Sequence, residues 1–405
     1  MTADATLTDL TKTSLLDLHR WVRRNGWTGY DPYDMDDWLL RLPRRWAELR
    51  LFGKRPSRLV MSLAERHPLA MRRLFVRRKI VPKGMALFAR AYLTMHQTLG
   101  DDEYLALSRE TADWLLDHPS PDCEGLGWGL PFLWLNAGTL IPTGTPCGTV
   151  SAVCGDALWQ LHAATGEPRY ADACRRICDG FLADHTLLRQ APDRLCFSYT
   201  PVDEWLVHNL NLLVAEFLAR VGEADGRDDY LDLARQACNY TLAEQRPDGS
   251  IPYWGTAFDR TFRSDHYHSG FEIRALHGLW KTTGWTDVRD ARDRYYEYYR
   301  SGFFGDDGAP WRDPNSADRI DIHGCAEALI CNAELADVFD DAAARLADAT
   351  RWSIEHMQER DGHFIHQIRR RDGGTRHRDT IPYIRWSQAW MMRALSAALA
   401  GLTTE

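Results

Sequence analysis

A unit made of two helical stretches recurs along this chain, and the repeat limits the fold more than any other feature. Each unit contains an apolar stretch, a turn with Gly, a second stretch, and a loop rich in aromatic residues and Gly. The first stretches span residues 84–99, 150–165, 204–221, 267–283, 322–338 and 384–400, and the second stretches end at Asp117, Asp184, Gln245, Arg300 and Gln358. Their spacing of roughly 54 to 66 residues is close to that of known repeat arrays.

The sixth unit lacks a second stretch, and the N-terminus supplies a candidate for it. Leu7–Arg24 carries Leu15, Leu18 and Trp21 at helical spacing. We therefore predict that Leu7–Arg24 packs beside Ile384–Ala400 and closes a ring.

The two kinds of stretch differ in polarity. The first stretches are small and apolar and the second carry the charges, so the first set should form an inner ring and the second an outer ring. The sequence predicts an all-α fold, an (α/α)6 toroid of six helical hairpins in a single domain over residues 1–405. Strand signals are sparse, and short runs such as 364–368 suit hairpins in the loops.

Composition argues against several functional classes. The 405 residues are 44% hydrophobic and 26% charged, which is typical of globular proteins. A net charge of −8 disfavours nucleic-acid binding, and no apolar window of about 18 residues suits a membrane span. The N-terminus has no secretory signal pattern, and nine cysteines without a C-x-x-C predict reduced thiols. We expect a cytoplasmic protein that needs no disulfide, metal or cofactor.

Six hairpins with aromatic loops resemble the toroid of the six-hairpin glycosidase superfamily, over residues 1–34 and 83–405. Four segments are similar to a bacterial and archaeal group found with polysaccharide biosynthesis genes: GWTGYDPYD (26–34), VHNLNLL (207–213), HYHSGFEIRAL (266–276) and RWSQAW (385–390). Some members of that group carry the name delta-aminolevulinic acid dehydratase. That enzyme needs a β/α barrel and a pair of active-site lysines, whereas this chain has five lysines and no alternation of strands and helices. The resemblance implies the toroid and carbohydrate chemistry, and a fold alone does not define a function.

Histidines mark a candidate site. In such a ring the loops that enter the inner helices gather on one face, where helix N-termini favour anionic groups. Alignment of the inner helices by their apolar pattern places His208, His268, His323 and Trp386 at equivalent positions in the first turn. Three histidines around one cavity suit general acid–base catalysis near neutral pH, and the alternative is that each is hydrogen-bonded in the core.

Carboxylates lie near these histidines in the sequence. The candidates are Asp203, Asp265, Glu272 and Asp321. A glycosidase needs two facing carboxyl groups, whereas the aspartates that precede helices also suit N-capping. Arg385, at the start of the sixth inner helix, suits bidentate binding of a substrate carboxylate or a surface ion pair.

Aromatic residues in the loops are the candidate sugar-binding surface, because the apolar faces of sugar rings stack on such side chains. They are Trp27, Tyr30, Tyr33, Trp128, Trp134, Tyr199, Tyr253, Trp254, Tyr267, Trp311, Tyr383 and Trp386. We predict one cavity that contains the three histidines, with Trp27, Tyr30 and Trp386 in its wall. Some of the other aromatic residues should only pack loops against the ring.

Two further motifs suggest other enzymes with α/α toroids. Asp34–Asp37 matches the D-x-D-D of class II terpene cyclases, although acidic residues also suit the first turn of a helix at 37–52. His266, His268, His323 and Cys325 could bind zinc as in lanthionine cyclases, but the two-Cys pattern of that family is missing.

Residues 38–83 fall outside the repeat and are basic. Between Arg41 and Lys83 there are 14 Lys and Arg against two acidic residues, with apolar residues interspersed. Such an insertion could contact an anionic membrane or a lipid-linked glycan. A solvated insertion folded against the acidic ring is the alternative that we favour.

These observations predict an enzyme that processes an oligosaccharide or polysaccharide with acidic sugars. Glycoside hydrolysis is the first expectation, because the superfamily catalyses it and carboxylates are present. Epimerisation or β-elimination by His and Tyr is the second, with Arg385 holding the acid group. A non-catalytic glycan-binding or assembly factor is the third.

Overall fold

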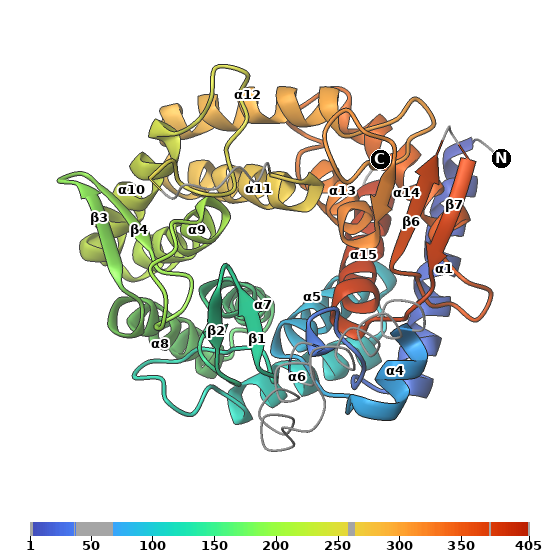
Figure 1. The fold of residues 1–405 in the computed structure, drawn as a ribbon, viewed down its shortest axis with the longest axis horizontal. Helices are drawn as coiled ribbons and strands as arrows, with labels where there is room; N and C mark the ends of the chain where they lie inside the picture. Colours follow the sequence, from blue (N-terminus) through green and yellow to red (C-terminus); the bar gives the residue numbers. More distant parts are fainter. Residues whose placement is uncertain (1–2, 36, 38–67, 258–263, 372–373, 404–405) are drawn as a thin grey trace, which may run out of the picture.

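Twelve helices form two concentric rings in the computed structural model (Figure 1), which describes residues 3–35, 37, 68–257, 264–371 and 374–403. The inner ring contains α5 (Pro82–Leu99), α7 (Gly148–Thr165), α9 (His208–Asp225), α11 (His266–Thr283), α13 (Ile322–Glu334) and α15 (Trp390–Thr403). The outer ring contains α6 (Asp102–Asp117), α8 (Pro168–Asp184), α10 (Asp228–Ala243), α12 (Thr286–Gly302), α14 (Ala342–Met357) and α1 (Ala3–Asn25). The fold is the predicted (α/α)6 toroid.

The ring closes between the two ends of the chain. Each inner helix packs against the next, and α15 packs against α5. Helix α1 occupies the outer position beside α15 and α14, with Leu15, Leu18 and Val22 buried. The predicted closure by the N-terminal helix is confirmed.

Glycine ends four of the inner helices. Gly100, Gly166, Gly226 and Gly284 have φ of +73°, +71°, +66° and +71°, a left-handed conformation that costs other residues energy. Each Gly N–H donates to the carbonyl four residues earlier, and the outer helix begins two residues after the Gly. These short turns make each outer helix run antiparallel to its inner partner.

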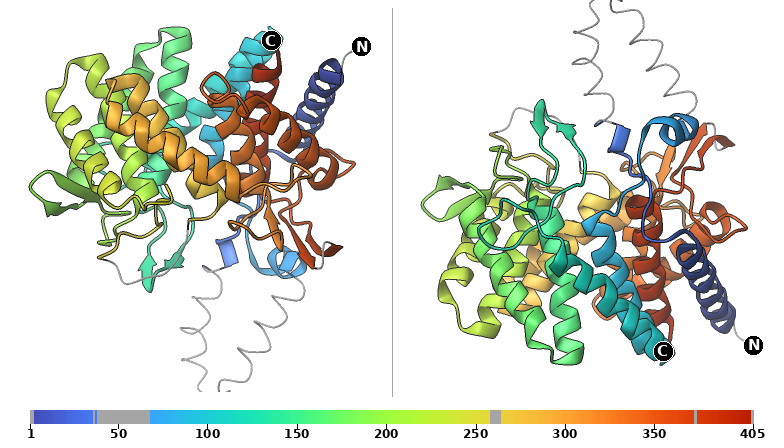
Figure 2. Two further views of the ribbon diagram at one scale, coloured as in Figure 1. Left: turned by 90° about the horizontal axis from the view of Figure 1, so that it is seen from above. Right: turned by 90° about the horizontal axis from the view of Figure 1, so that it is seen from below.

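Small sheets occur only in the long loops of the described ranges. They are β1 (Trp134–Asn136) with β2 (Thr139–Ile141), β3 (Leu187–Ala191) with β4 (Arg194–Phe197), and β5 (Arg319–Asp321) with β6 (Gln367–Arg371) and β7 (Gly374–Asp379). The hairpin anticipated at 364–368 therefore starts three residues later. Figure 2 shows the strands at one end of the ring and the chain termini at the other.

The sixth inner helix starts with a wide turn, so its prediction as one regular helix is corrected. Residues Ile384–Ala389 form a π-helix, η1, in which Gln388 N–H donates to Tyr383 O. The Gln388 side chain bonds both the N–H and the C=O of Phe364, which fixes this turn against the neighbouring loop. π-Helical turns are frequent at functional sites.

Most of the basic segment 38–83 lies outside the described residues, and its proposed contact with a membrane or glycan stays a prediction. Its described part includes α4 (Pro68–Phe75), where Arg72 bonds Asp34 at 3.0 Å. Lys79 then forms a β-bridge with Gly29. Within the described ranges, every helix is too short or too polar to cross a lipid bilayer.

Candidate functional site

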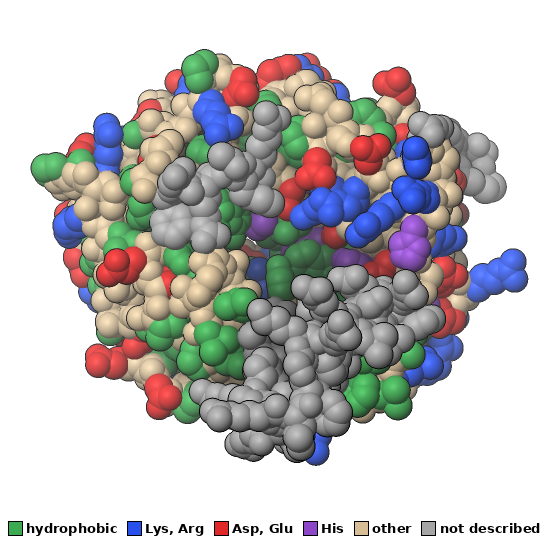
Figure 3. Space-filling view, viewed as in Figure 1, with side chains coloured by type: hydrophobic (Ala, Val, Ile, Leu, Met, Phe, Trp, Pro, Cys, Tyr) green, Lys and Arg blue, Asp and Glu red, His purple; other side chains and the backbone are tan. Residues whose placement is uncertain are grey.

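A cavity of about 800 Å³ lies at the N-terminal ends of the inner helices. Figure 3 shows a hollow over the centre of the ring, with hydrophobic and histidine side chains at its base. The described lining residues are Tyr33, Lys83, Leu130, Trp134, Asn136, Cys147, Thr149, Val150, Tyr199, Asn209, Tyr253, Trp254, Tyr267, His268, Phe271, Arg312, His323, Arg385 and Trp386. The long loops and the first helical turns together form this cavity.

Aromatic side chains form a continuous band around the cavity. The ring of Tyr33 lies 6.3 Å from that of Trp134 and 5.9 Å from that of Trp386. Trp134 in turn lies 6.4 Å from Tyr199, and Trp386 lies 5.5 Å from Tyr267. Such a band offers apolar faces on which a sugar ring can stack.

Asp265 and His268 form a carboxylate–histidine pair in the cavity wall. Asp265 caps α11 by accepting a hydrogen bond from the His268 N–H at 3.2 Å, and its Oδ1 lies 2.8 Å from His268 Nδ1. Asp265 is 1% exposed, and Arg312 Nη2 lies 3.6 Å from its other oxygen. Asp265 thus places a carboxylate directly beside the imidazole, an arrangement also found in histidine-dependent acid–base catalysis.

His323 has a contrasting environment. Its backbone N–H donates to the helix cap Asp321 at 2.9 Å, and its ring stacks on Tyr267 at 4.3 Å between ring centres. Among the described residues neither ring nitrogen has a hydrogen-bond partner. Burial, with the nearby charges of Lys83 and Arg385, holds the pKa of His323 well below its usual value. His323 is therefore a neutral imidazole with a nitrogen lone pair.

Three cations contribute to the cavity lining. Arg385 donates two hydrogen bonds to Asp31, at 2.6 and 2.8 Å. Lys83 Nζ lies over the rings of Phe271 and Trp390, at 5.5 and 5.6 Å. Burial, followed by the charge of Arg385, lowers the pKa of Lys83 to about 8. Arg312, 3.6 Å from Asp265, is the third cation of the lining.

No Asp or Glu occurs among the described residues that line the cavity. The nearest predicted carboxylates, Asp265 and Asp321, cap the helices that carry His268 and His323. Asp321 also accepts the indole N–H of Trp386 at 3.0 Å. The N-cap roles predicted for Asp265 and Asp321 are both present. The two carboxylates also contact His268 and Trp386, whose side chains line the cavity.

His208 does not share this cavity, which corrects the expectation of three converging histidines. It faces the outer helix α10, where Nδ1 bonds Thr241 and Nε2 lies 2.9 Å from Glu244. Its neighbour Asn209 lines the cavity instead. Because each residue turns a helix by about 100°, an alignment error of one position exchanges the cavity face for the outer-helix face.

Two predicted carboxylates also have other roles. Asp203 accepts hydrogen bonds from the backbone N–H groups of Tyr199, Thr200 and Trp205 and so shapes a loop rather than capping α9. Glu272 is fully buried and accepts a hydrogen bond from Tyr295 of α12. Burial raises the pKa of Glu272 well above its usual value. Neither carboxylate lines the cavity.

Five predicted aromatic residues pack the ring instead of lining the cavity. Trp128 is fully buried and donates its indole N–H to Leu115 O. Tyr383 packs against His366 and under the guanidinium of Arg72. The other three are partly buried against the hydrophobic core, and they are Trp27, Tyr30 and Trp311.

The lining residues that were not predicted from the sequence include Lys83, Asn209, Phe271 and Arg312. Lys83 is one of only five lysines and lies at the start of an inner helix, a signal that could have identified it. Arg312 follows a loop tryptophan. Asn209 and Phe271 carry no signal beyond their position in the helix.

The described residues of the candidate zinc site and of the D-x-D-D motif contact other parts of the structure instead of one another. His266 bonds Trp311 O and Tyr299 Oη on its outer side, and Cys325 interacts with Ser353 of α14. Within the described ranges no three His, Cys, Asp or Glu residues are arranged to hold a metal ion. Asp34 is bonded to Arg72, and Asp36 lies outside the described residues.

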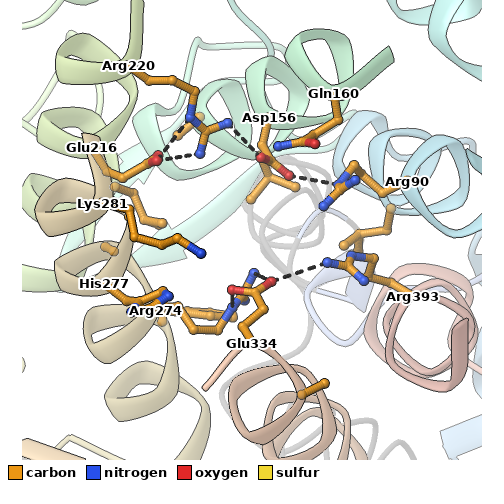
Figure 4. Close-up of a pocket in the computed structure, with 18 of the residues that line it drawn as sticks. Arg90, Asp156, Gln160, Glu216, Arg220, Arg274, His277, Lys281, Glu334 and Arg393 are labelled. Atoms are coloured by element: carbon orange, nitrogen blue, oxygen red, sulfur yellow. Dashed lines mark hydrogen bonds and ion pairs between the residues drawn. The ribbon is translucent and has the colours of Figure 1, made fainter. Parts of the chain in front are cut away.

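A second compartment of about 550 Å³ lies deeper in the ring (Figure 4). Lys83 and Phe271 line both compartments, and the Phe271 ring stacks on that of Trp390 at 5.2 Å. These three side chains form the boundary between the compartments.

Ion pairs line the deeper compartment. Arg90 and Arg220 both bond Asp156, at 3.1 and 2.8 Å, and Arg220 also bonds Glu216. This quartet links α5, α7 and α9 and has no net charge.

A second quartet links the other three inner helices. Arg274 bonds Glu327 at 3.1 Å and Glu334 at 2.9 Å, and Arg393 bonds Glu334 at 3.2 Å. These charges are paired with one another, and the two quartets link neighbouring helices of the inner ring. The upper cavity is the candidate active site.

The (α/α)6 toroid is a fold that this chain shares with solved structures of several carbohydrate-active enzymes. No protein-family profile matches the chain, and no curated protein matches it by sequence. Among solved structures, D-mannose isomerase is 13% identical, with a TM-score of 0.59 over 80% of this chain and 88% of that chain. The cellobiose 2-epimerase of Bacillus thermoamylovorans is 10% identical, with a TM-score of 0.61 over 80% and 89%.

An unsaturated glucuronyl hydrolase specific for heparin is 11% identical, with a TM-score of 0.59 over 98% of this chain and 97% of that chain. These likenesses establish the fold. They give no support to the name delta-aminolevulinic acid dehydratase.

Proposed function

We propose that this protein is a carbohydrate-processing enzyme that moves a proton at a sugar carbon next to a carbonyl or carboxylate group, as an epimerase or isomerase does. One observation carries the proposal: His268 and His323 share a cavity with three cations and without a lining carboxylate. Two titratable groups in contrasting environments are typical of an acid–base pair. The isomerase and the epimerase among the similar structures have activities of this class.

The different environments of His323 and His268 indicate which histidine accepts the proton and which donates it. Neutral His323 accepts the proton as the C–H bond breaks, and the electron pair moves onto the neighbouring carbonyl or carboxylate oxygen. Lys83, Arg312 and Arg385 stabilise that oxygen. His268, supported by Asp265, donates a proton to the same carbon or the adjacent one. In the reverse direction the two histidines exchange roles.

Glycoside hydrolysis is the second candidate, because the glucuronyl hydrolase matches nearly the whole chain. Hydrolysis needs two carboxyl groups about 5–5.5 Å or 6.5–9.5 Å apart across the substrate. Asp265 and Asp321 are the available pair, but both already cap helices. β-Elimination needs the same base as epimerisation.

Incubation of the protein with neutral and acidic mono- and oligosaccharides in deuterated water separates these reactions. Carbon-bound deuterium with unchanged chain length supports the proposal. New reducing ends without deuterium mean hydrolysis, and an unsaturated sugar means elimination. Binding without any conversion supports the non-catalytic alternative.

Histidine variants test the assignment. His268→Gln and His323→Gln should each lower kcat about 10²- to 10⁴-fold. His208→Gln is the matched control, because His208 also begins an inner helix but faces away from the cavity. A loss of activity in the control equal to that in the other two would contradict the assignment.

A further inference from the structure

Two arginines lie directly opposite one another in the three-stranded sheet, with a histidine opposite the second of them. In the register of β5, β6 and β7, Arg319 is opposite Arg369, and Arg369 is opposite His377. Like charges in this position destabilise an antiparallel sheet. The stability of the sheet therefore does not explain this row, which we call the Arg319–Arg369–His377 row.

A groove of about 830 Å³ runs along the row, and its described lining contains five arginines and His377 against two aspartates. Arg319 pairs with Asp313 at 3.2 Å. The Nε of Arg369 bonds only the neutral amide oxygen of Gln367, at 3.3 Å, among the residues that the structure describes. The groove thus has an excess of positive charge that its own carboxylates do not balance.

The groove lies next to the cavity. Arg312 lines the cavity, and its backbone N–H donates to Arg319 O at 2.9 Å, so the two surfaces share one loop. Asp321, at the end of β5, caps the helix that carries His323. Figure 3 shows Lys and Arg side chains gathered beside the hollow.

We propose that the Arg319–Arg369–His377 row binds the carboxylate or sulfate groups of an acidic glycan chain whose end occupies the cavity. This rests on the proposed function, because the cavity must accept a sugar.

Calorimetric binding of the full-length protein to heparin oligosaccharides, and to neutral dextran oligosaccharides of equal length, tests the proposal. The double variant R319Q/R369Q should lower the affinity for the acidic chain roughly tenfold. It should also weaken the salt dependence of binding, because fewer counterions are released. The affinity for the neutral dextran chain should be the same in the parent protein and in R319Q/R369Q.

Arg378→Gln is the control, because Arg378 lies in the same hairpin but pairs with Glu359. It should leave the affinity for the acidic chain unchanged. R319Q/R369Q removes two opposed cations from the sheet, so it should melt no lower than the parent protein, and a loss of binding then does not reflect unfolding.

Three results would overturn the inference: equal affinity of the parent and R319Q/R369Q for heparin oligosaccharides, an equal loss in R378Q, or binding of a DNA oligonucleotide with the same dependence on the row. The two proposals fail separately. A protein that binds the acidic chain through the row but converts no sugar retains this inference and loses the proposed function. If the protein converts sugars but R319Q/R369Q does not change its affinity for the acidic chain, the proposed function stands and this inference fails.

Discussion

At the residue scale, Lys83 combines a cost in stability with a role in the cavity. Its pKa is lowered to about 8 because burial, and then Arg385, disfavour the charged form. The unfolded chain therefore binds more protons than the native protein between about pH 8 and the ordinary lysine pKa near 10.4. Charged Lys83 lowers the free energy of unfolding at pH 7, and this penalty disappears as the pH rises through that interval.

We predict that Lys83→Met raises the free energy of unfolding at pH 7 by up to about 3 kcal/mol and lowers kcat. Urea denaturation across pH 7–10.5 measures the effect, and the difference from the parent should shrink as the pH rises. Lys281→Met, which changes an exposed lysine, is the control. A Lys83→Met variant that is less stable at pH 7 contradicts this account.

Asp265 is a positioning residue, and its charge should matter more than its cap. Asp265→Asn keeps the cap of α11, because Asn caps helices as well as Asp does. The variant should fold normally and lose about 10²- to 10⁴-fold in kcat, with little change in KM, because the imidazole of His268 loses the carboxylate beside it. A normal kcat would show that His268 acts without the carboxylate.

At the element scale, His366 connects α13 to the three-stranded sheet. It lies between Asp321, at 3.5 Å, and Asp379, at 2.7 Å. Burial opposes its protonation, but these two carboxylates raise the pKa of His366 to about 9. A raised pKa in the folded state means that this stabilisation is complete below the unfolded pKa near 6.5 and is lost as the pH rises through about 9.

We predict that the free energy of unfolding falls by up to about 3 kcal/mol between pH 6.5 and 9.5 because of His366. Denaturant melts at closely spaced pH values measure this slope. His366→Gln should remove that part of the slope while it keeps a neutral hydrogen-bonding side chain. Parallel slopes in the parent and the variant would count against the role of His366.

The helices could be predicted because each is encoded locally. An apolar period and a turn glycine such as Gly166 suffice to define a hairpin. His268 and His323 were identified for the same reason, since each lies in the first turn of a recognisable helix. The facing direction of His208 was not predictable, because one residue of helical register decides it. The opposition of Arg319 and Arg369 was not predictable either, because strand register between distant segments has no local signal.

At the scale of the whole molecule, closure of the ring depends on α1. Leu7, Leu15, Leu18, Trp21 and Val22 are buried when α1 packs beside α15 and α14. Burial of five such side chains contributes on the order of 10 kcal/mol, which is comparable to the whole stability of a typical protein.

We therefore predict that deletion of residues 1–25 leaves a chain that aggregates or melts far below the parent. Solubility and thermal unfolding by circular dichroism measure this outcome. Addition of a synthetic peptide of residues 1–25 should partly restore the folded state. A truncated protein that melts like the full chain would mean that closure contributes little.

Closure also determines when this protein can become native during its synthesis. α15 packs against α1, α5 and α13, and all three precede it in translation. Until α15 leaves the ribosome, the nascent chain is an open arc in which α5 and α13 lack a neighbour and present apolar side chains to chaperones and proteases. Because α15 follows all the other helices of the two rings, ribosome stalling before α15 has emerged would leave a product with nearly all of its hairpins but no closed ring.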